Sequence, residues 1–380
     1  MEPKPLVFSR EKVIALVVEI FGPVLHAKDV DSLAHAVVGA MHSDALSIHA
    51  LGRGLANVQE SSAKHAIKRI DRLLGNQRLT PDRAFGGWVP WVIGARKEIV
   101  VAIDWTEYAD DEHHRVAIHL VTDHGRATPL VWKTVRAEDL KTRRSEYESD
   151  VLRALREAVP PKVRVTVLGD RAFGDSSLYE YCDTVLKFDY VFRFRECILV
   201  EHPEVEGARA SDWIPTDGTA RRVDDACVTH KRYRLKAVVC VHAKGMKEAW
   251  CLATSRSDDA NAIVQLYGRR FTIEEAFRDE KDGHFGAGFL HTTIGDPLRR
   301  DRMLLVHAIA TTLLTLLGRA GENASAYKEL KANTSPRRQH SLFFQGREYL
   351  KGVVAHRYEN VCAELEKLLG SRRGKTFGVI

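Results

Sequence analysis

Two short apolar runs in the middle of the chain each end in an aspartate, and they limit the fold most strongly. Residues 99–103 read IVVAI and precede Asp104, whereas residues 163–169 read VRVTVLG and precede Asp170, 66 positions after the first aspartate. Apolar runs of this length, rich in β-branched residues, predict buried strands. We therefore expect a sheet that brings both aspartates to one edge.

A third acidic position lies on a predicted helix. The segment YGRRFTIEEAFRDEK places Tyr267, Arg270, Glu274 and Lys281 at successive spacings of three, four and seven. At about 100° per residue, these four side chains fall within an arc of about 60° on one helical face. A carboxylate between two cations and a phenol suits a divalent metal and a phosphodiester together. The pattern predicts nucleic-acid chemistry.

Two neighbouring glutamates compete with Glu274 for the metal role. Glu275 and Glu280 point about 80° and 140° away from the direction of Tyr267 on a regular helix. Glu274 is therefore the predicted ligand. The structural alternative for the whole motif is a set of i, i+4 salt bridges between Glu274 and its basic neighbours on an exposed helix.

Composition permits nucleic-acid binding without requiring it. The chain has 380 residues, 44% of them hydrophobic, and 57 basic against 51 acidic side chains, for a net charge of +6. This length allows two or three domains with real cores. The six cysteines form no C-x2-C pair, so we interpret them as free thiols in a reducing compartment.

The most apolar stretch, residues 303–318, contains His307 and is too short to span a bilayer, so it predicts a buried helix. We also find no signal peptide at the start of the sequence. Both observations favour a cytoplasmic protein with no membrane partner.

Residues 1–95 have the apolar periodicity of helices, with segments at 13–21, 33–41, 48–58 and 62–75. The last of these is predicted to begin at the N-cap Ser62, to stop at Gly75 and to turn Ala63, Ile67, Ile70 and Leu74 inward. Its outer face carries Lys64, Lys68, Arg69 and Arg72. A helix, a break and a basic helix resemble a helix-turn-helix that binds DNA. A solvated basic face on a helical bundle is the open alternative.

The remaining chain alternates between strands and helices. Strands are predicted at 99–104, 115–122, 127–135, 163–169 and 185–193, and helices at 142–158 and 176–182. We expect an α/β protein with five segments: a helical DNA-binding domain at 1–95, a mixed-sheet core at 96–195, a β-rich insertion at 196–256, the second part of the core at 257–325 and a helical C-terminal region at 326–380. The C-terminal region is a candidate for dimerisation or DNA contact.

These motifs resemble those of the DDE transposases of the insertion-sequence-four family, and within it the branch of insertion sequence ten. The likeness covers most of the chain and rests on AIDWTEY around Asp104, LGDRAFGD around Asp170, AWCLATS around Trp250 and the Tyr-x2-Arg-x3-Glu-x6-Lys signature. It implies an RNase H-like core interrupted by the insertion. By chance, the signature alone should arise on the order of once in a few hundred chains of this size.

The resemblance also implies a role for each residue. Asp104, Asp170 and Glu274 would hold two Mg²⁺ ions, which Mn²⁺ could replace, with Asp104 shared between them. Arg270, Lys281 and Tyr267 would bind phosphates beside the scissile bond. Trp250 would stack a base flipped from the DNA end, although a tryptophan on a strand is more often part of the core.

The implied enzyme binds the terminal inverted repeats of its element, cuts both strands by way of a hairpin, and joins the 3′ ends to target DNA. It would act as a homodimer in the bacterial cytoplasm, at the nucleoid. Two alternatives stay open: a nuclease on the same core that performs no strand transfer, and an inactive domesticated copy that only binds DNA. The intact acids argue against the second.

His113 and His114 follow Asp104 closely and could act in proton transfer or metal binding. A solvated hairpin, shared with Asp110, Asp111 and Glu112, is the alternative that we favour.

Overall fold

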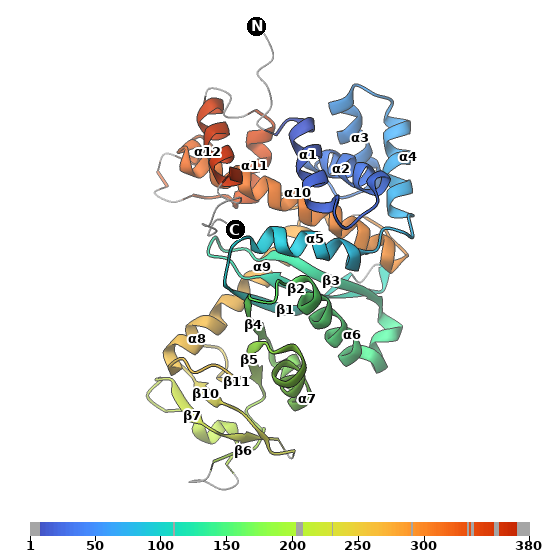
Figure 1. Cartoon of the computed structure of the whole chain (residues 1–380). Coiled ribbons are helices and arrows are strands. Elements are labelled where there is room, and N and C mark those ends of the chain that lie inside the picture. Colours follow the sequence, from blue (N-terminus) through green and yellow to red (C-terminus); the bar gives the residue numbers. More distant parts are fainter. Residues whose placement is uncertain are drawn as a thin grey trace.

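The protein is elongated, with a central sheet between a helical end and a β-rich end (Figure 1). The computed structural model describes residues 8–108, 111–202, 208–229, 231–289, 292–332, 334–335, 338–352 and 357–370. Asp110 therefore lies outside the described residues. The buried side chains form one continuous hydrophobic core that runs from Phe8 to Leu368.

Five helices form the first part of the chain. They are α1 (Arg10–Phe21), α2 (Ala27–Met41), α3 (Ile48–Gln59), α4 (Ala63–Leu74) and α5 (Pro81–Ile93). The first four match predicted segments, but α5 was not predicted as an element. Its sequence PDRAFGGWVPWVI contains two glycines and an internal proline, which weaken helix propensity. Burial of Phe85, Trp88 and Val92 stabilises it instead.

The helix α4 packs differently from the predicted pattern at its first turn. Ala66, Ile70, Leu73 and Leu74 are buried, whereas Ala63 is exposed. Ser62 holds the N-cap position, but its side chain makes no capping hydrogen bond. The preceding helix α3 ends at Glu60, whose backbone is left-handed.

The helices α3 and α4 approach each other closely at Gly52. A Cβ atom on Gly52 would lie 2.4 Å from Cγ1 and 2.6 Å from Cα of Ile67. Any larger residue would therefore push α4 away from α3.

The central sheet begins with β1 (Glu98–Tyr108), β2 (His113–Leu120), β3 (Thr128–Arg136), β4 (Arg164–Gly169) and β5 (Asp189–Phe194). The strand order is β3-β2-β1-β4-β5, in which β1, β4 and β5 are parallel and β2 is antiparallel to both of its neighbours. This mixed sheet is compatible with an RNase H-like core. Strand β1 continues four residues beyond Asp104, so the prediction that it ends there was wrong, because its pairing with β2 extends the ladder to Tyr108.

Helices cover the sheet. The helix α6 (Ala137–Ala158) packs on β2 and β3, and α5 packs on β3 and α6. Beyond β4 the chain forms a short 3₁₀ turn η2 (Arg171–Phe173), the helix α7 (Ser176–Glu180) and a π-helical turn η3 (Tyr181–Leu186).

Residues 196–256 are rich in strands, as predicted, but they do not form a separate sheet throughout. The strands are β6 (Val200–Glu201), β7 (Arg221–Asp224), β8 (Cys227–Val228), β9 (Tyr233–Arg234), β10 (Ala237–Val241) and β11 (Trp250–Thr254), with a 3₁₀ turn η4 (Ala210–Trp213). Three of them extend the central sheet in the order β5-β11-β10-β7, while β6, β8 and β9 form a small second sheet. Strand β11 thus pairs with the edge of β5 that β4 leaves free.

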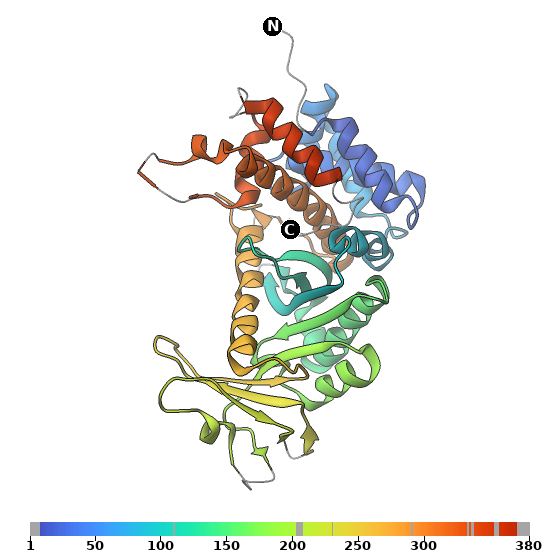
Figure 2. The same cartoon turned by 60° about the vertical axis from the view of Figure 1, so that its left-hand side comes forward.

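The motif helix is not one continuous α-helix. It consists of α8 (Ala260–Gly268), a 3₁₀ turn η5 (Arg269–Phe271) and α9 (Thr272–Lys281). Figure 2 shows these segments running along the side of the molecule, from the β-rich end towards the helical end. The expectation of one regular helix through the motif was therefore wrong, and the tighter 3₁₀ turn changes the angles between successive side chains.

The C-terminal part is helical, with α10 (Pro297–Asn323), the 3₁₀ segment η7 (Ala326–Leu330), α11 (Leu342–Leu350) and α12 (Tyr358–Gly370). The helix α10 contacts α2, α4, α11, α12 and β3, so the helical regions share a core around it. Among the described helices, α10 alone is long and apolar enough to span a membrane, but most of it is buried inside the protein. This confirms the predicted buried helix, although the helix is longer than the apolar run.

Candidate active site

The two aspartates lie side by side because their strands are neighbours. Strands β1 and β4 pair in parallel, with Ile103 opposite Gly169, so Asp104 and Asp170 each follow one member of the same pair. Strand β4 ends at Gly169, whereas Asp104 lies within β1 beside that end. The carboxyl ends of parallel strands are where α/β proteins commonly bind ligands. The predicted adjacency of these strands is therefore confirmed.

Local backbone groups orient both carboxylates. Trp105 N–H donates to Asp104 Oδ1 at 2.8 Å, and Ala172 N–H donates to Asp170 Oδ1 at 2.8 Å, where Asp170 caps the turn η2. Each hydrogen bond involves one oxygen of its carboxylate. Both side chains are partly accessible.

The third acid reaches the same site through Arg270. The guanidinium donates to Asp104 Oδ2 at 3.3 Å and to Glu274 Oε1 at 2.6 Å. The side chain of Arg270 is 7% exposed and that of Glu274 is 46% exposed. The i, i+4 salt bridge of the structural alternative is thus present, but its arginine is buried against the sheet rather than on an open helix.

The charges of the three acids affect one another. The pKa of Asp104 is raised to about 6, because burial and the charges of Asp170 and Glu274 raise it more than the Arg270 guanidinium and the Trp105 N–H lower it. The negative charges of Asp170 and Glu274 thus disfavour ionisation of Asp104. A nearby positive charge is needed to keep all three carboxylates ionised. In the structure, Arg270 supplies that charge.

The donor set fits a hard divalent cation, because it consists of three carboxylates and no nitrogen or sulfur ligand. In the described parts of the chain, however, no three acidic, histidine or cysteine side chains are close enough together to form a ready-made metal shell. The Arg270 guanidinium lies between Asp104 and Glu274.

Two aromatic side chains of the motif region, Tyr267 and Trp250, pack against each other. Tyr267 is almost fully buried, and its ring meets that of Trp250 edge-on, with 4.9 Å between the centroids. Burial raises the pKa of Tyr267 to about 12, so the phenol keeps its proton at neutral pH. Phe271 lies 6.1 Å from Trp250 and is 43% exposed, which makes it an aromatic neighbour that the motif did not predict.

A protein-family model described as a transposase DDE domain matches residues 95–313 of the chain. The chain belongs to the transposase DDE domain family. The matched residues include Asp104, Asp170, Glu274 and the whole segment from Tyr267 to Lys281. A search of curated proteins found no match. Membership implies a DNA-cleaving, metal-dependent transposase.

Lys281 lies at the far end of α9 in the DDE domain, and its side chain reaches strand β1. Its Nζ donates to Glu107 O at 2.8 Å and lies 5.3 Å from the centre of the Tyr108 ring. Burial lowers the pKa of Lys281. Lys281 therefore contacts β1 at Glu107, three residues beyond Asp104, whereas Arg270 contacts Asp104 itself.

The competing glutamates of the DDE domain have other partners. Glu280 is buried and accepts hydrogen bonds from Tyr108 and from Arg115, the latter at 2.9 Å. Glu275 pairs with Arg278 at 2.9 Å and lies 3.7 Å from Arg126. Glu274 is therefore the glutamate that faces the aspartates.

The expected solvated hairpin after β1 was wrong at His113. This residue is buried at the start of β2, and its Nδ1 accepts a hydrogen bond from Arg300 Nε at 3.1 Å. Arg300 also pairs with Asp111. These long-range partners on α10 could not be identified from the local sequence.

Glu148 of α6 is a further acid at the edge of the site, and sequence reasoning missed it. It accepts from Trp105 Nε1 at 2.8 Å and from Arg144 Nε at 3.0 Å. Burial raises its pKa, the hydrogen bonds from Trp105 and Arg144 lower it, and the charge of Asp170 raises it. The i, i+4 spacing from Arg144 was the only available sequence signal.

The basic helix α4 lies in the helical end, outside the matched DDE domain. Lys64, Lys68 and Arg72 are exposed on it. Arg69 is instead held by Asp31 at 2.5 Å and by His35 Nδ1 at 2.8 Å. At the C-terminal end of α4, Arg302 of α10 donates to Leu74 O at 2.8 Å.

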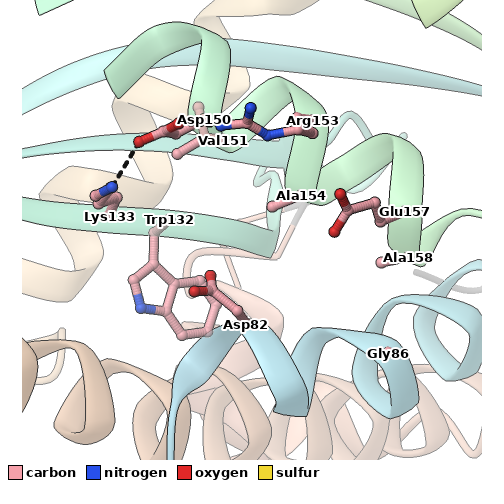
Figure 3. Close-up of a pocket in the computed structure, with 10 residues that line it drawn as sticks. All are labelled: Asp82, Gly86, Trp132, Lys133, Asp150, Val151, Arg153, Ala154, Glu157 and Ala158. Atoms are coloured by element: carbon pink, nitrogen blue, oxygen red, sulfur yellow. Dashed lines mark hydrogen bonds and ion pairs between the residues drawn. The ribbon is translucent and has the colours of Figure 1, made fainter. Parts of the chain in front are cut away.

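A separate pocket of about 330 Å³ lies between α5, β3 and α6 (Figure 3). Its charged lining residues are Asp82, Lys133, Asp150, Arg153 and Glu157. Lys133 pairs with Asp150 at 2.6 Å, and Arg153 contacts the same carboxylate. None of the predicted site residues lines this pocket.

Proposed function

We propose that the protein is a transposase that binds the terminal inverted repeats of its own element, cuts both strands at each end and joins the 3′ ends to target DNA. The observation that carries this proposal is that Asp104 and Asp170 follow paired residues of β1 and β4, while Arg270 donates to both Asp104 and Glu274. These groups provide metal ligands and phosphate ligands within one site of the DDE domain.

The three acids would hold two Mg²⁺ ions, or Mn²⁺ in their place. When bound, the metals supply charge stabilisation for the attacking and leaving oxygens of a phosphodiester displacement. Asp104, between the strand neighbour Asp170 and the helix residue Glu274, is the acid placed to be shared. The backbone N–H groups of Trp105 and Ala172 hold the aspartates in position.

The remaining site residues would bind the DNA strand. Arg270 can grip a phosphate with two parallel N–H donors, and the neutral Tyr267 phenol can donate one more hydrogen bond. Lys281 would hold a more distant phosphate as a point charge. Trp250, whose ring lies against Tyr267, would stack a base turned out of the duplex.

Several steps would use this same site. Water would first release a 3′ hydroxyl, which attacks the opposite strand and closes a hairpin. Water would then reopen the hairpin, and the same 3′ hydroxyl would attack the target strand. Every step replaces one phosphate ester oxygen by another, so a single set of residues can serve all of them.

Recognition of the ends would fall to α4. Its exposed cations run along the helix from Lys64 and Lys68 to Arg72 in the last turn. The N-terminal residues of a recognition helix are those that contact base edges, which favours Lys64 and Lys68 for that role. Its C-terminal end is held by Arg302 of α10, whereas Lys64 and Lys68 nearer the N-terminus are exposed. Arg69 would contribute to DNA binding only after leaving Asp31.

Joining two ends requires two active sites, so we propose a homodimer in the complex with DNA. The exposed part of the C-terminal region is the candidate interface. The enzyme would act in the bacterial cytoplasm, on the nucleoid.

The test is cleavage of a supercoiled plasmid that carries the element's own ends, in Mg²⁺, by the unmodified protein and by Glu274→Ala. We expect Glu274→Ala to bind the ends in a gel shift and to leave them uncut. Glu275→Ala is the matched control, because it removes a neighbouring carboxylate that faces Arg278 instead. Equal cutting by Glu274→Ala and the unmodified protein would refute the assignment.

A second assay separates transposition from simple cleavage. Pre-cut ends with free 3′ hydroxyl groups are incubated with target DNA and the protein. Joined products support the proposed transposase, whereas cutting without joining indicates the nuclease alternative.

A further inference from the structure

Arg270 occupies a position that is unusual for a residue whose proposed partner is DNA. Its two terminal nitrogens donate to Asp104 and Glu274, the acids proposed to bind metal. The arginine is buried. The positive charge therefore lies between two of the three carboxylates.

Three acids in a half-buried site need a positive charge even when no metal is bound. The pKa of Asp104 is raised by burial and by the charges of Asp170 and Glu274, whereas the Arg270 charge and, to a smaller extent, the Trp105 N–H lower it. Guanidinium keeps its proton throughout the ordinary pH range. The contact can thus be broken by movement of the side chain and not by its deprotonation.

Two features of the surroundings favour such a movement. Arg270 belongs to the 3₁₀ turn η5 between α8 and α9, and 3₁₀ segments within longer helices often mark functional hinges. Its Nε is buried and makes no hydrogen bond within the described residues. A phosphate could satisfy this N–H together with a terminal one in a bidentate contact.

Aromatic rings line the path outward. The guanidinium carbon lies 4.8 Å from the centre of the partly exposed Phe271 ring and 5.9 Å from that of Tyr267. Faces of aromatic rings attract guanidinium groups. The side chain can therefore turn towards the solvent side of the site without losing all of its contacts.

We propose that Arg270 is an internal counter-ion that keeps the three-acid site closed to metal in the DNA-free protein, and that a phosphate of the bound DNA end draws it away and admits the metal. This inference rests on the proposed function, because it takes the acids as metal ligands and DNA as the trigger. It adds that the metal and the DNA end bind cooperatively. Cutting is then restricted to engaged ends.

The test measures Mn²⁺ binding to the full chain from the electron paramagnetic resonance signal of the free ion. The unmodified protein, Arg270→Gln and Arg270→Lys are titrated with and without a duplex of the element's end. Arg269→Gln is the matched control, since Arg269 lies in the same turn but is exposed. Glu274→Gln reports how much of the binding belongs to the acids.

Without DNA, we expect Arg270→Gln to bind Mn²⁺ about tenfold or more tightly than the unmodified protein, with Arg270→Lys between the two. The duplex should tighten binding to the unmodified protein by a similar factor and change Arg270→Gln little. Arg269→Gln should behave as the unmodified protein. Equal or weaker Mn²⁺ binding by Arg270→Gln without DNA would overturn the proposal.

Loss of the arginine could also destabilise the fold, so thermal melting is followed in the same samples. In chelator, Arg270→Gln should melt below the unmodified protein, and Mn²⁺ should raise its melting temperature by the larger amount. A smaller or equal rise contradicts the counter-ion role. Failure of the transposase assignment would appear separately, as absent plasmid cutting by a protein that binds Mn²⁺ as expected.

Discussion

Two arginine–glutamate pairs lie at opposite ends of α9, and they differ in how many of the glutamate oxygens have hydrogen-bond partners. Near the start, Glu274 accepts from Arg270 and is 46% exposed. Near the end, Glu280 is 3% exposed and is bound by Arg115 and Tyr108, with His307 Nε2 at 4.0 Å. The first pair keeps oxygen atoms accessible to a ligand, whereas the second has both oxygens occupied.

The two pairs therefore have different tasks. Burial alone would raise the pKa of Glu280, but Arg115, His307 and Tyr108 hold it below its ordinary value, so it stays ionised within the core. The ion pair with Arg115 connects α9 to β2, and the hydrogen bond from Tyr108 connects it to β1. The same helix can then hold Glu274 and its partner Arg270 beside Asp104 in a fixed orientation.

The largest expected effect comes from breaking the buried pair. Glu280→Ala leaves Arg115 charged and without its partner in the core, which should lower the free energy of unfolding by about 3–5 kcal/mol. Denaturation by urea measures this loss. The matched Glu274→Ala variant should lose less than about 1 kcal/mol, because its pair is partly solvated. Equal losses in the two variants would remove the distinction.

The next largest effect is a gain in the free energy of unfolding when Asp104, beside Arg270 and Glu274, loses its charge. The raised pKa of Asp104, about 6, means that the folded state disfavours the ionised carboxylate, so this group costs stability as pH rises through the range from about 4 to 6. In chelator at pH 8, Asp104→Asn should be more stable than the unmodified protein, by up to about 3 kcal/mol. The difference should disappear near pH 4. Lower stability of Asp104→Asn at pH 8 would refute the repulsion among the acids.

A third pair lies between these extremes. Glu148 is 9% exposed in its side chain while its partner Arg144 is 44% exposed, and Glu148 also accepts from the Trp105 indole. Glu148→Ala should cost about 1.5–3 kcal/mol, since a buried donor loses a charged acceptor. Glu148→Gln keeps an oxygen for the indole and should cost less. If chemical denaturation gives the same loss for both variants, the indole bond is unimportant.

The smallest stability effect is expected on α4, where a similar contrast separates two adjacent cations. Lys68 is exposed, so Lys68→Ala should change stability by less than about 0.5 kcal/mol, while weakening end binding and reducing the salt slope by about 1. Arg69 is engaged with Asp31. Arg69→Ala should cost up to about 1 kcal/mol of stability and change the slope less. Filter binding at several salt concentrations measures the slope of log affinity against log salt concentration. An unchanged slope in Lys68→Ala would exclude that lysine from phosphate contact.

Sequence reasoning reached the acids because their signals are local. The apolar run before Asp104 and the one before Asp170 can each be recognised within a few residues, and the parallel pairing of β1 with β4 then brings them together. Helical periodicity likewise selected Glu274 over Glu280. Burial of the apolar helix α10 followed from the same kind of pattern.

The remaining features depend on contacts between distant parts of the chain. The pairing of Arg115 with Glu280 joins residues 165 positions apart, and Arg300 reaches His113 across 187 positions. The 3₁₀ turn that directs Arg270 inward lies in a segment whose residues would also suit a continuous α-helix. Helix α5 was missed because burial, and not propensity, stabilises it.

The ladder between β5 and β11 has a consequence for how such a chain can change over evolution. Phe194, the last residue of β5, pairs with Cys251 near the start of β11, so the chain returns to a position beside the one at which β5 ends. The intervening 56 residues, 195–250, form an excursion whose two ends are already held together. Changing the length of the loops in that segment would not displace α8 or Glu274, since loop length adds little once the ends are fixed. Strand β10 is not part of this freedom, because it pairs with β11 and contacts α8. Relatives could therefore acquire new DNA contacts there by insertion while inheriting the same catalytic frame.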